Sequence, residues 1–196
     1  KRDVRDPHFV IFNSRLFVYT GTWYCGDTSP KSYDMNQHLG YAVSSSDGAR
    51  WEGPRMLEGT YGHYVWRAAT HNGRVYLCGR RKREFIETAT RAEQDAAVES
   101  ALLESSDGYT FRTAGLFQET YGDETAFLFE RDGSILAVAR SGGNRNAQLL
   151  RARAPYQRWE RSDLGRYIGG PLLARWGERY LVGGRKQTPN GPRTVL

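Results

Sequence analysis

The sequence predicts an all-β protein, a β-propeller of four-stranded antiparallel blades, because one hairpin pattern returns four times along the chain. Each copy is a polar turn followed by residues of high strand propensity, which is typical of a β-hairpin. The copies occupy residues 13–19, 72–78, 132–138 and 176–182, so their starts lie 59, 60 and 44 residues apart. Repeats of this length that contain several strands are typical of propeller blades.

A second motif gives the position of the outer strands within each unit. Ser-Ser-Asp-Gly occurs at 45–48 and 105–108, and Trp51 and Phe111 follow. The Ser and Asp side chains bond nearby backbone N–H groups, Gly adopts the positive φ, and we expect the aromatic residue to pack between sheets. The third unit has Ala154-Pro155 in place of Asp-Gly and continues to Trp159.

These repeats predict a single domain over residues 1–196, with three complete blades and a partial fourth. Hairpin turns are expected at 13–15, 72–74, 131–134 and 176–178. Propellers usually close with about four to eight blades, so we expect a fragment of a longer, five- or six-bladed protein that is truncated at its C-terminus. A secreted or periplasmic location would require a signal peptide before residue 1.

The composition excludes several classes of protein. A hydrophobic content of 39% with 22 glycines indicates a globular β protein and not a disordered chain. The longest apolar runs fall far short of the roughly 20 residues that span a bilayer, so no membrane span is expected. The net charge of +6 has no nucleic-acid-binding motif beside it, so no nucleic-acid partner is expected.

Cysteine and histidine indicate neither a metal nor a cofactor. Cys25 and Cys78 could form a disulfide only if the fold brings them together, and the sequence leaves both states open. The four histidines are scattered, which is not the spacing of a metal site. The sequence gives no indication of the oligomeric state.

Propeller geometry places many charged residues on one face. The start of the first strand, the end of the second and the loop from the second to the third share this face, and the Ser-x-Asp-Gly turns lie on the other. The residues expected here are Arg5, Asp6, Tyr64, Arg67, Arg80, Asp123, Glu124, Arg140 and Arg185, with Asp27, Asp34, Arg91 and Glu93 in its loops. Such a cluster suits an anionic or polyhydroxylated ligand, although structural ion pairs are the alternative. A helical turn within 86–98 is expected beside it, as a partial lid.

Residues 124–140 resemble the sialidase superfamily: a glutamate opens an inner strand, an Asp-Gly turn follows, and an arginine closes the next strand. Arg5-Asp6-Pro7 is similar to the Arg-Ile-Pro opening of the first sialidase blade. The Ser-x-Asp-Gly turns are similar to the Asp-box, or BNR repeat, with one residue fewer before the aromatic. The resemblance implies an exo-acting glycoside hydrolase on terminal, anionic sugars of glycans.

The resemblance also implies roles for individual residues. Arg5 and Arg140 would hold the substrate carboxylate, Glu124 would pair with a nucleophilic tyrosine, and Asp34 or else Asp27 would be the acid/base. Arg185 or Arg193 would be the third arginine, although neither spacing matches well. No tyrosine of this sequence matches the nucleophile. We expect Glu124 and Arg140 to contact each other and to converge with Arg5 and Arg67 on one central pocket, with Asp34 at its edge.

Two alternatives remain open. Arg-Asp-Pro also resembles the opening of five-bladed glycosidases that use three carboxylates, in which Asp6 would carry the chemistry. Those enzymes often have a catalytic glutamate before a Gly-Pro pair, whereas here Ile168-Gly169 precede Gly170-Pro171. The second alternative is a non-catalytic propeller that binds a glycan or a protein, because fold alone does not decide function.

Overall fold

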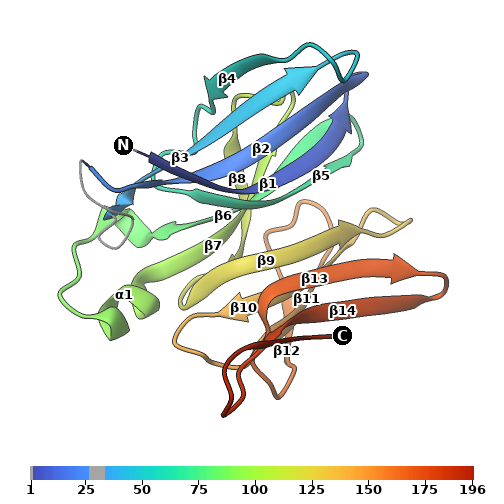
Figure 1. The fold of residues 1–196 in the computed structure, drawn as a ribbon. Coiled ribbons are helices and arrows are strands. Elements are labelled where there is room, and N and C mark those ends of the chain that lie inside the picture. The colour runs from blue at the N-terminus through green and yellow to red at the C-terminus, as the bar shows by residue number, and fades with distance from the viewer. Residues whose placement is uncertain (1, 27–33) are drawn as a thin grey trace.

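The computed structural model describes residues 2–26 and 34–196, which form four antiparallel sheets, here called blades 1 to 4 (Figure 1). Blade 1 holds β1 (Arg2–Phe12), β2 (Arg15–Tyr24), β3 (Asp34–Ser45) and β4 (Glu52–Met56). Blade 2 holds β5 (Tyr64–His71), β6 (Arg74–Lys82), β7 (Val98–Ser105) and β8 (Arg112–Gln118). Blade 3 holds β9 (Gly122–Phe129), β10 (Ile135–Ser141), β11 (Gln148–Ala152) and β12 (Glu160–Asp163). Blade 4 holds β13 (Gly169–Trp176), β14 (Arg179–Lys186) and β15 (Arg193–Val195).

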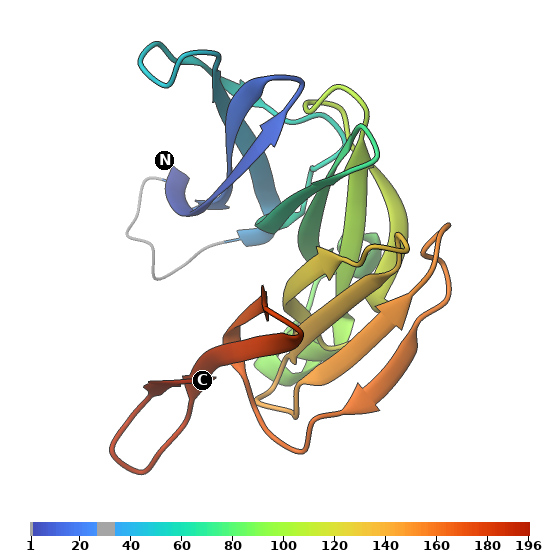
Figure 2. The same cartoon turned by 90° about the vertical axis from the view of Figure 1, so that its right-hand side faces the viewer.

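The blades form an open arc around a central axis, with blades 1 and 4 at its two ends (Figure 2). Within each blade the strands lie in sequence order, and the first strands β1, β5, β9 and β13 contact one another from blade to blade. The predicted all-β propeller with three complete blades and a partial fourth is therefore confirmed.

The four inner hairpins lie where the repeat predicts them. Their turns fall between the paired residues Phe12 and Arg15, His71 and Arg74, Phe129 and Ile135, and Trp176 and Arg179. Asn13, Ser14 and Asn72 have φ of 48°, 59° and 45°. Two-residue hairpins need this positive φ because it matches the twist of the flanking strands.

The Ser-x-Asp-Gly turns are built by one carboxylate each. Asp107 Oδ1 accepts hydrogen bonds from the backbone N–H of Tyr109 and Thr110, both at 2.7 Å, and from the hydroxyl of Ser105. Asp47 bonds in the same way within blade 1. The hydroxyl of Tyr19 in blade 1 donates to the carbonyl of Gly108, so the turn also joins two blades.

The aromatic residue after this turn packs on the preceding blade. Phe111 of blade 2 lies edge-on to Tyr19 of blade 1, and Trp159 of blade 3 packs on Phe117 of blade 2. Both are at least 91% buried, whereas Trp51 of blade 1 is 44% exposed. The expectation that each such aromatic packs between sheets is wrong for Trp51, because no blade precedes blade 1 in the described part of the chain.

The hydrophobic core consists of layers between neighbouring blades. Blades 1 and 2 enclose Phe17, Ala42 and Leu77, and blades 2 and 3 enclose Leu102, Phe117 and Phe127. Blade 4 closes on blade 3 through Ile168 and Leu173. Each layer holds the inner strands at a fixed spacing, which positions the strand ends that carry the charged residues.

The segment between β6 and β7 contains the expected helical turn. It holds the 3₁₀ turn η1 (Arg83–Phe85) and the helix α1 (Arg91–Ala97), which begins with a capping box between Thr90 and Glu93. No helix among the described residues is long and apolar enough to cross a membrane. Cys25 and Cys78 are buried free thiols, so they form no disulfide.

Two buried histidines predict how stability depends on pH. Burial lowers the pKa of His38 and of His63 to about 3, and the charges of Arg80 and Arg81 respectively add to this. Above pH 6.5 the histidines are neutral in both folded and unfolded states. Below it only the unfolded chain takes up protons, so the free energy of unfolding should fall by about 1.4 kcal/mol per pH unit for each histidine.

Urea unfolding between pH 7.5 and 5 would measure this slope. Replacement of His63 by Asn should reduce the slope by the contribution of one histidine, about 1.4 kcal/mol per pH unit. This holds even where the variant is less stable overall. A free energy of unfolding that stays constant from pH 7 to pH 5 would contradict the prediction.

Candidate functional site

The candidate site lies where the inner hairpins end. Strand pairing sets Tyr64 opposite Arg80 and Ser141 opposite Gly122, so β5 and β9 begin beside the ends of β6 and β10. The Asp107 turn follows the far end of β7, because the beginning of β7 pairs with the end of β6. The predicted placement of Glu124 and Arg140 on the face opposite Asp107 is therefore confirmed.

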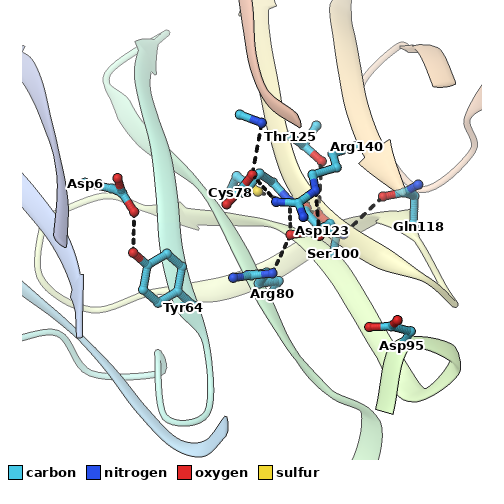
Figure 3. A network of polar contacts seen from close by, with 12 residues as sticks. Asp6, Tyr64, Cys78, Arg80, Asp95, Ser100, Gln118, Asp123, Thr125 and Arg140 are labelled. Carbon is cyan, nitrogen blue, oxygen red and sulfur yellow. Dashed lines mark hydrogen bonds and ion pairs between the residues drawn. The ribbon is translucent and has the colours of Figure 1, made fainter. Parts of the chain in front are cut away.

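Seven residues from blades 1, 2 and 3 form a central cluster at this face, and Figure 3 labels all of them except Arg67 and Glu124. Their side chains bond one another or act on one another electrostatically, and strands β1, β5, β6, β9 and β10 carry them. They are Asp6, Tyr64, Arg67, Arg80, Asp123, Glu124 and Arg140.

Asp6 is directed toward the cluster by an irregularity in β1. The register with β2 shifts between Arg5 and His8, and Asp6 has a φ of 53°. The buried hydroxyl of Tyr64 donates a short hydrogen bond to the half-buried carboxylate of Asp6. Burial, and then this bond, raises the pKa of Tyr64. Tyr64 is thus a neutral donor that holds Asp6 in place.

Arg5 lies at the edge of the cluster, and the direct contacts of its side chain are with Asp3 and Trp23. Its guanidinium donates to Asp3 at 2.7 Å and lies 4.3 Å from the ring of Trp23. The irregularity in β1 directs Asp6, and not Arg5, toward Tyr64. The hydrogen bond with Asp3 raises the pKa of Arg5, and electrostatic interactions with Tyr64 and Asp6 add to this. Among the described residues no hydrogen bond or ion pair joins Arg5 to Glu124 or Arg140, and its convergence with them on one pocket stays a prediction.

Asp123 and Glu124 bind two arginines from neighbouring blades. Arg140 Nη1 lies 2.7 Å from Glu124 Oε2, and its Nε lies 3.1 Å from Asp123 Oδ2. Arg80 of blade 2 pairs with the other oxygen of Asp123, which is 3% exposed. The predicted contact between Glu124 and Arg140 is confirmed.

Glu124 is held in its ionised form. Burial alone would raise its pKa, but the charges of Arg80 and Arg140, with hydrogen bonds from Arg140 and from the N–H of Gly170, outweigh burial and lower it. The Gly170 bond is 3.1 Å long and connects blade 4 to the cluster. Such a carboxylate keeps its negative charge at neutral pH and is poorly suited to donate a proton.

Arg67 lies between the two ends of the cluster. Its Nη2 donates to the carbonyl of Pro171 at 2.8 Å, and its Nε is buried without a hydrogen-bond partner among the described residues. Burial lowers the pKa of Arg67, while Asp6 and Glu124 are among the groups that oppose this effect. Arg67 therefore interacts electrostatically with both carboxylates, although it forms an ion pair with neither in the described part of the chain.

Two other predicted residues, Asp34 and Arg185, lie outside the cluster. Asp34 is exposed at the start of β3, where its carboxylate accepts from the N–H of Asn36 at 2.9 Å. Arg185 lies 3.5 Å from the hydroxyl of Tyr167, and Asp27 lies outside the described residues. The role of Asp34 as acid/base stays a prediction.

The structure adds two groups that the sequence reasoning missed. The ring of Tyr167 lies 5.6 Å from the guanidinium of Arg140, and the N–H of Gly170 bonds Glu124. Tyr167 lies two residues before β13 and belongs to no sequence motif, so the sequence gives no signal for its role. The only sequence signal for Gly170 is the Gly-Gly-Pro run, in which Gly170 adopts a φ of 56°.

Among the described residues, Asp6 and Arg67 form no ion pair, and their side chains bond the hydroxyl of Tyr64 and the carbonyl of Pro171, respectively. Arg80 and Arg140 are neutralised by Asp123 and Glu124, which supports the structural ion-pair alternative for these two arginines. Across the described residues, no three His, Cys, Asp or Glu side chains gather in a way that could hold a metal ion.

The shared carboxylate of Asp123 predicts a large effect on stability. In Asp123→Asn, the buried guanidinium groups of Arg80 and Arg140 both lose the carboxylate of Asp123, although Arg140 keeps its pair with Glu124. Removing one partner of a buried ion pair typically costs about 3–5 kcal/mol. Glu119→Gln is the matched control, because its ion pair with Arg161 is exposed and such pairs contribute about 1 kcal/mol or less. Chemical denaturation measures both, and equal losses in the two variants would refute the prediction.

No family model and no curated protein matches the chain. Among solved structures, a protein of unknown function from Dyadobacter fermentans is 15% identical with a TM-score of 0.75, over 97% of this chain and 59% of that one. A GH43_1 enzyme from Xanthomonas citri complexed with xylotriose is 15% identical with a TM-score of 0.61, over 98% of this chain and 73% of that one. The Trypanosoma rangeli sialidase in complex with sialic acid is 13% identical with a TM-score of 0.61, over 94% of this chain and 34% of that one.

These similarities establish the fold. The chain spans 59% of the length of the Dyadobacter protein and 34% of the sialidase. At such low identity, a shared architecture carries no activity with it. The chain is therefore a β-propeller of the architecture found in sialidases and in GH43 glycosidases.

Proposed function

We propose that this propeller carries the site of an exo-acting glycoside hydrolase, at the mouth where the central cluster lies. The observation that supports this most is the convergence of Asp6, Arg67 and Glu124 from three blades on one face. The solved structures that resemble this chain include a GH43_1 enzyme and a sialidase, which is consistent with the proposal at the level of fold.

Asp6 is the carboxylate best placed to meet the substrate. It is half-buried and held by Tyr64, and a shift in the β1–β2 register turns it toward the cluster. In our proposal Asp6 takes the proton from the water that attacks the anomeric carbon, as carboxylates do in glycoside hydrolysis. This role corresponds to the three-carboxylate alternative, in which Asp6 carries the chemistry.

Glu124 and Arg140 act as a fixed pair in this proposal. Because Glu124 stays ionised, it orients Arg140 and the start of β13 and does not supply the proton to the leaving group. Arg67 is half-buried, and in our proposal the accessible part of its guanidinium donates to the sugar, while its Nε is buried. Asp34 remains the proposed proton donor, from the same rim.

A sialidase-type substrate is the second candidate. Arg140 and Arg185 both lie beside Tyr167, at 5.6 Å from its ring and 3.5 Å from its hydroxyl. This arrangement of two guanidinium groups around one tyrosine supports a binding site for the carboxylate of an anionic sugar. Arg140 is partly neutralised by its own carboxylates, which weakens this candidate relative to a neutral sugar.

The first test compares Asp6→Asn with Asp34→Asn in the intact protein, on fluorogenic sialosides and neutral glycosides. Asp6→Asn should lower kcat by at least 100-fold, since general acid–base groups contribute about 10²- to 10⁴-fold. Asp34→Asn should lower kcat while sparing KM. If Asp34→Asn is fully active and Asp6→Asn inactive, the acid/base role of Asp34 is wrong and the role of Asp6 is retained.

The second test concerns Arg67. Arg67→Met removes a charge-assisted hydrogen bond of about 1.5–3 kcal/mol and should lower kcat/KM roughly 10- to 100-fold. Arg153→Met is the control, because Arg153 is an exposed arginine at the end of blade 3 away from the site. A protein that folds and cleaves none of these glycosides would leave only the binding alternative.

A further inference from the structure

A polar groove of about 610 Å³ adjoins the central cluster over blade 3. It is formed by the ends of β8, β10 and β12, the start of β11, and the β8–β9 and β10–β11 connections. Residues that line it and carry the argument are Gln118, Tyr121, Ser141, Arg145, Asn146 and Gln148. None of these residues belongs to the proposed catalytic machinery.

Two buried residues of the groove, Gln118 and Ser141, also connect it to the cluster. The carboxamide of Gln118 accepts from the N–H of Asp123 at 3.4 Å and donates to the hydroxyl of Ser141 at 3.0 Å. Ser141 directly follows Arg140 on β10. In Figure 3, Gln118 lies on the side of Asp123 away from Asp6. The groove therefore extends the site outward on the same face.

The lining suits an uncharged ligand with many hydroxyl groups. The amide of Asn146 donates to Asp163 at 3.3 Å, and Gln148 Oε1 accepts from Gln118 at 3.5 Å. A side-chain amide has two donor and two acceptor positions, so each can also match neighbouring hydroxyls of a sugar. The charges of Arg145 and Asp163 cancel across the lining. The guanidinium of Arg145 lies 3.7 Å from the ring centre of Tyr121, which gives the groove a flat, rigid wall.

We propose that this groove binds a second, neutral sugar unit, whose neighbour at the chain end occupies the central cluster. The substrate is then an oligosaccharide that runs from the cluster outward over blade 3. This inference rests on the proposed function, and it adds the class of substrate and the direction in which that substrate lies.

The exposed rim of the groove can be substituted without changing its buried floor. Gln118 and Ser141 are buried and form the floor, whereas Arg145 and Asn146 are exposed on the rim. Arg145→Ala and Asn146→Ala therefore remove ligand contacts while the core stays intact. Arg158→Ala is the matched control, because Arg158 is also exposed but lies in the β11–β12 connection on the opposite face.

The experiment measures kcat/KM of the intact protein on a 4-nitrophenyl glycoside and on the trisaccharide of the same sugar. Each rim variant should lower kcat/KM on the trisaccharide by about 2- to 10-fold, the range for one neutral hydrogen bond. The monosaccharide derivative should be cleaved at the unaltered rate, and Arg158→Ala should leave both rates unchanged. Equal effects on the two substrates, or no effect on either, would overturn the groove proposal alone.

A binding measurement separates this inference from the proposed function. Side-chain amide signals of Asn146 and Gln148 can be followed by NMR during titration with xylotriose, cellotriose and maltotriose. Shifts of the Gln148 amide that occur in the unaltered protein and are lost in Asn146→Ala would support the groove even if the protein cleaves no glycoside. Absence of shifts with all three, together with absence of cleavage, would overturn both proposals.

Discussion

The buried carboxylate of Asp123 is the contact on which the site depends. It pairs with Arg80 of blade 2 and Arg140 of blade 3, and its backbone N–H bonds Gln118. Two cations from different blades are therefore held at one point by one anion. Arg140 in turn fixes Glu124, so the inner mouth is neutral overall and rigid. This arrangement gives the partly exposed Asp6 and Arg67 a fixed frame.

Packing between blades places these charges in register. Aromatic side chains lie in layers between neighbouring sheets. Phe111, which follows the outer turn of blade 2, packs on Tyr19 of blade 1, and Trp159 of blade 3 packs on Phe117 of blade 2. These layers hold the inner strands side by side, so that the ends of β6 and β10 face the start of β9. An ion pair between blades needs this spacing, because the attraction between two charges repays the cost of their burial only where their geometry is good.

Much of the fold followed from local sequence patterns. Asn-Ser and Asn-Gly turns require positive φ, and the Asp turns require a short acceptor next to free N–H groups, so both are fixed by residues close in sequence. The contact between Glu124 and Arg140 is similarly local, because one hairpin joins them. The exposure of Trp51 was not predictable in this way, since it depends on whether another blade lies against it.

The sequence by itself determined the repeat, the hairpins, the face on which the charged strand ends meet, and the pairing of Glu124 with Arg140. Only the tertiary structure decided that Asp6 and not Arg5 turns inward, that Arg80 and Arg140 share Asp123, and that Tyr64 holds Asp6. The physical reason is the separation along the chain of the residues that interact. A turn or hairpin is specified by neighbours along the chain, whereas a bulge in β1 and a carboxylate shared between blades depend on how separate sheets pack.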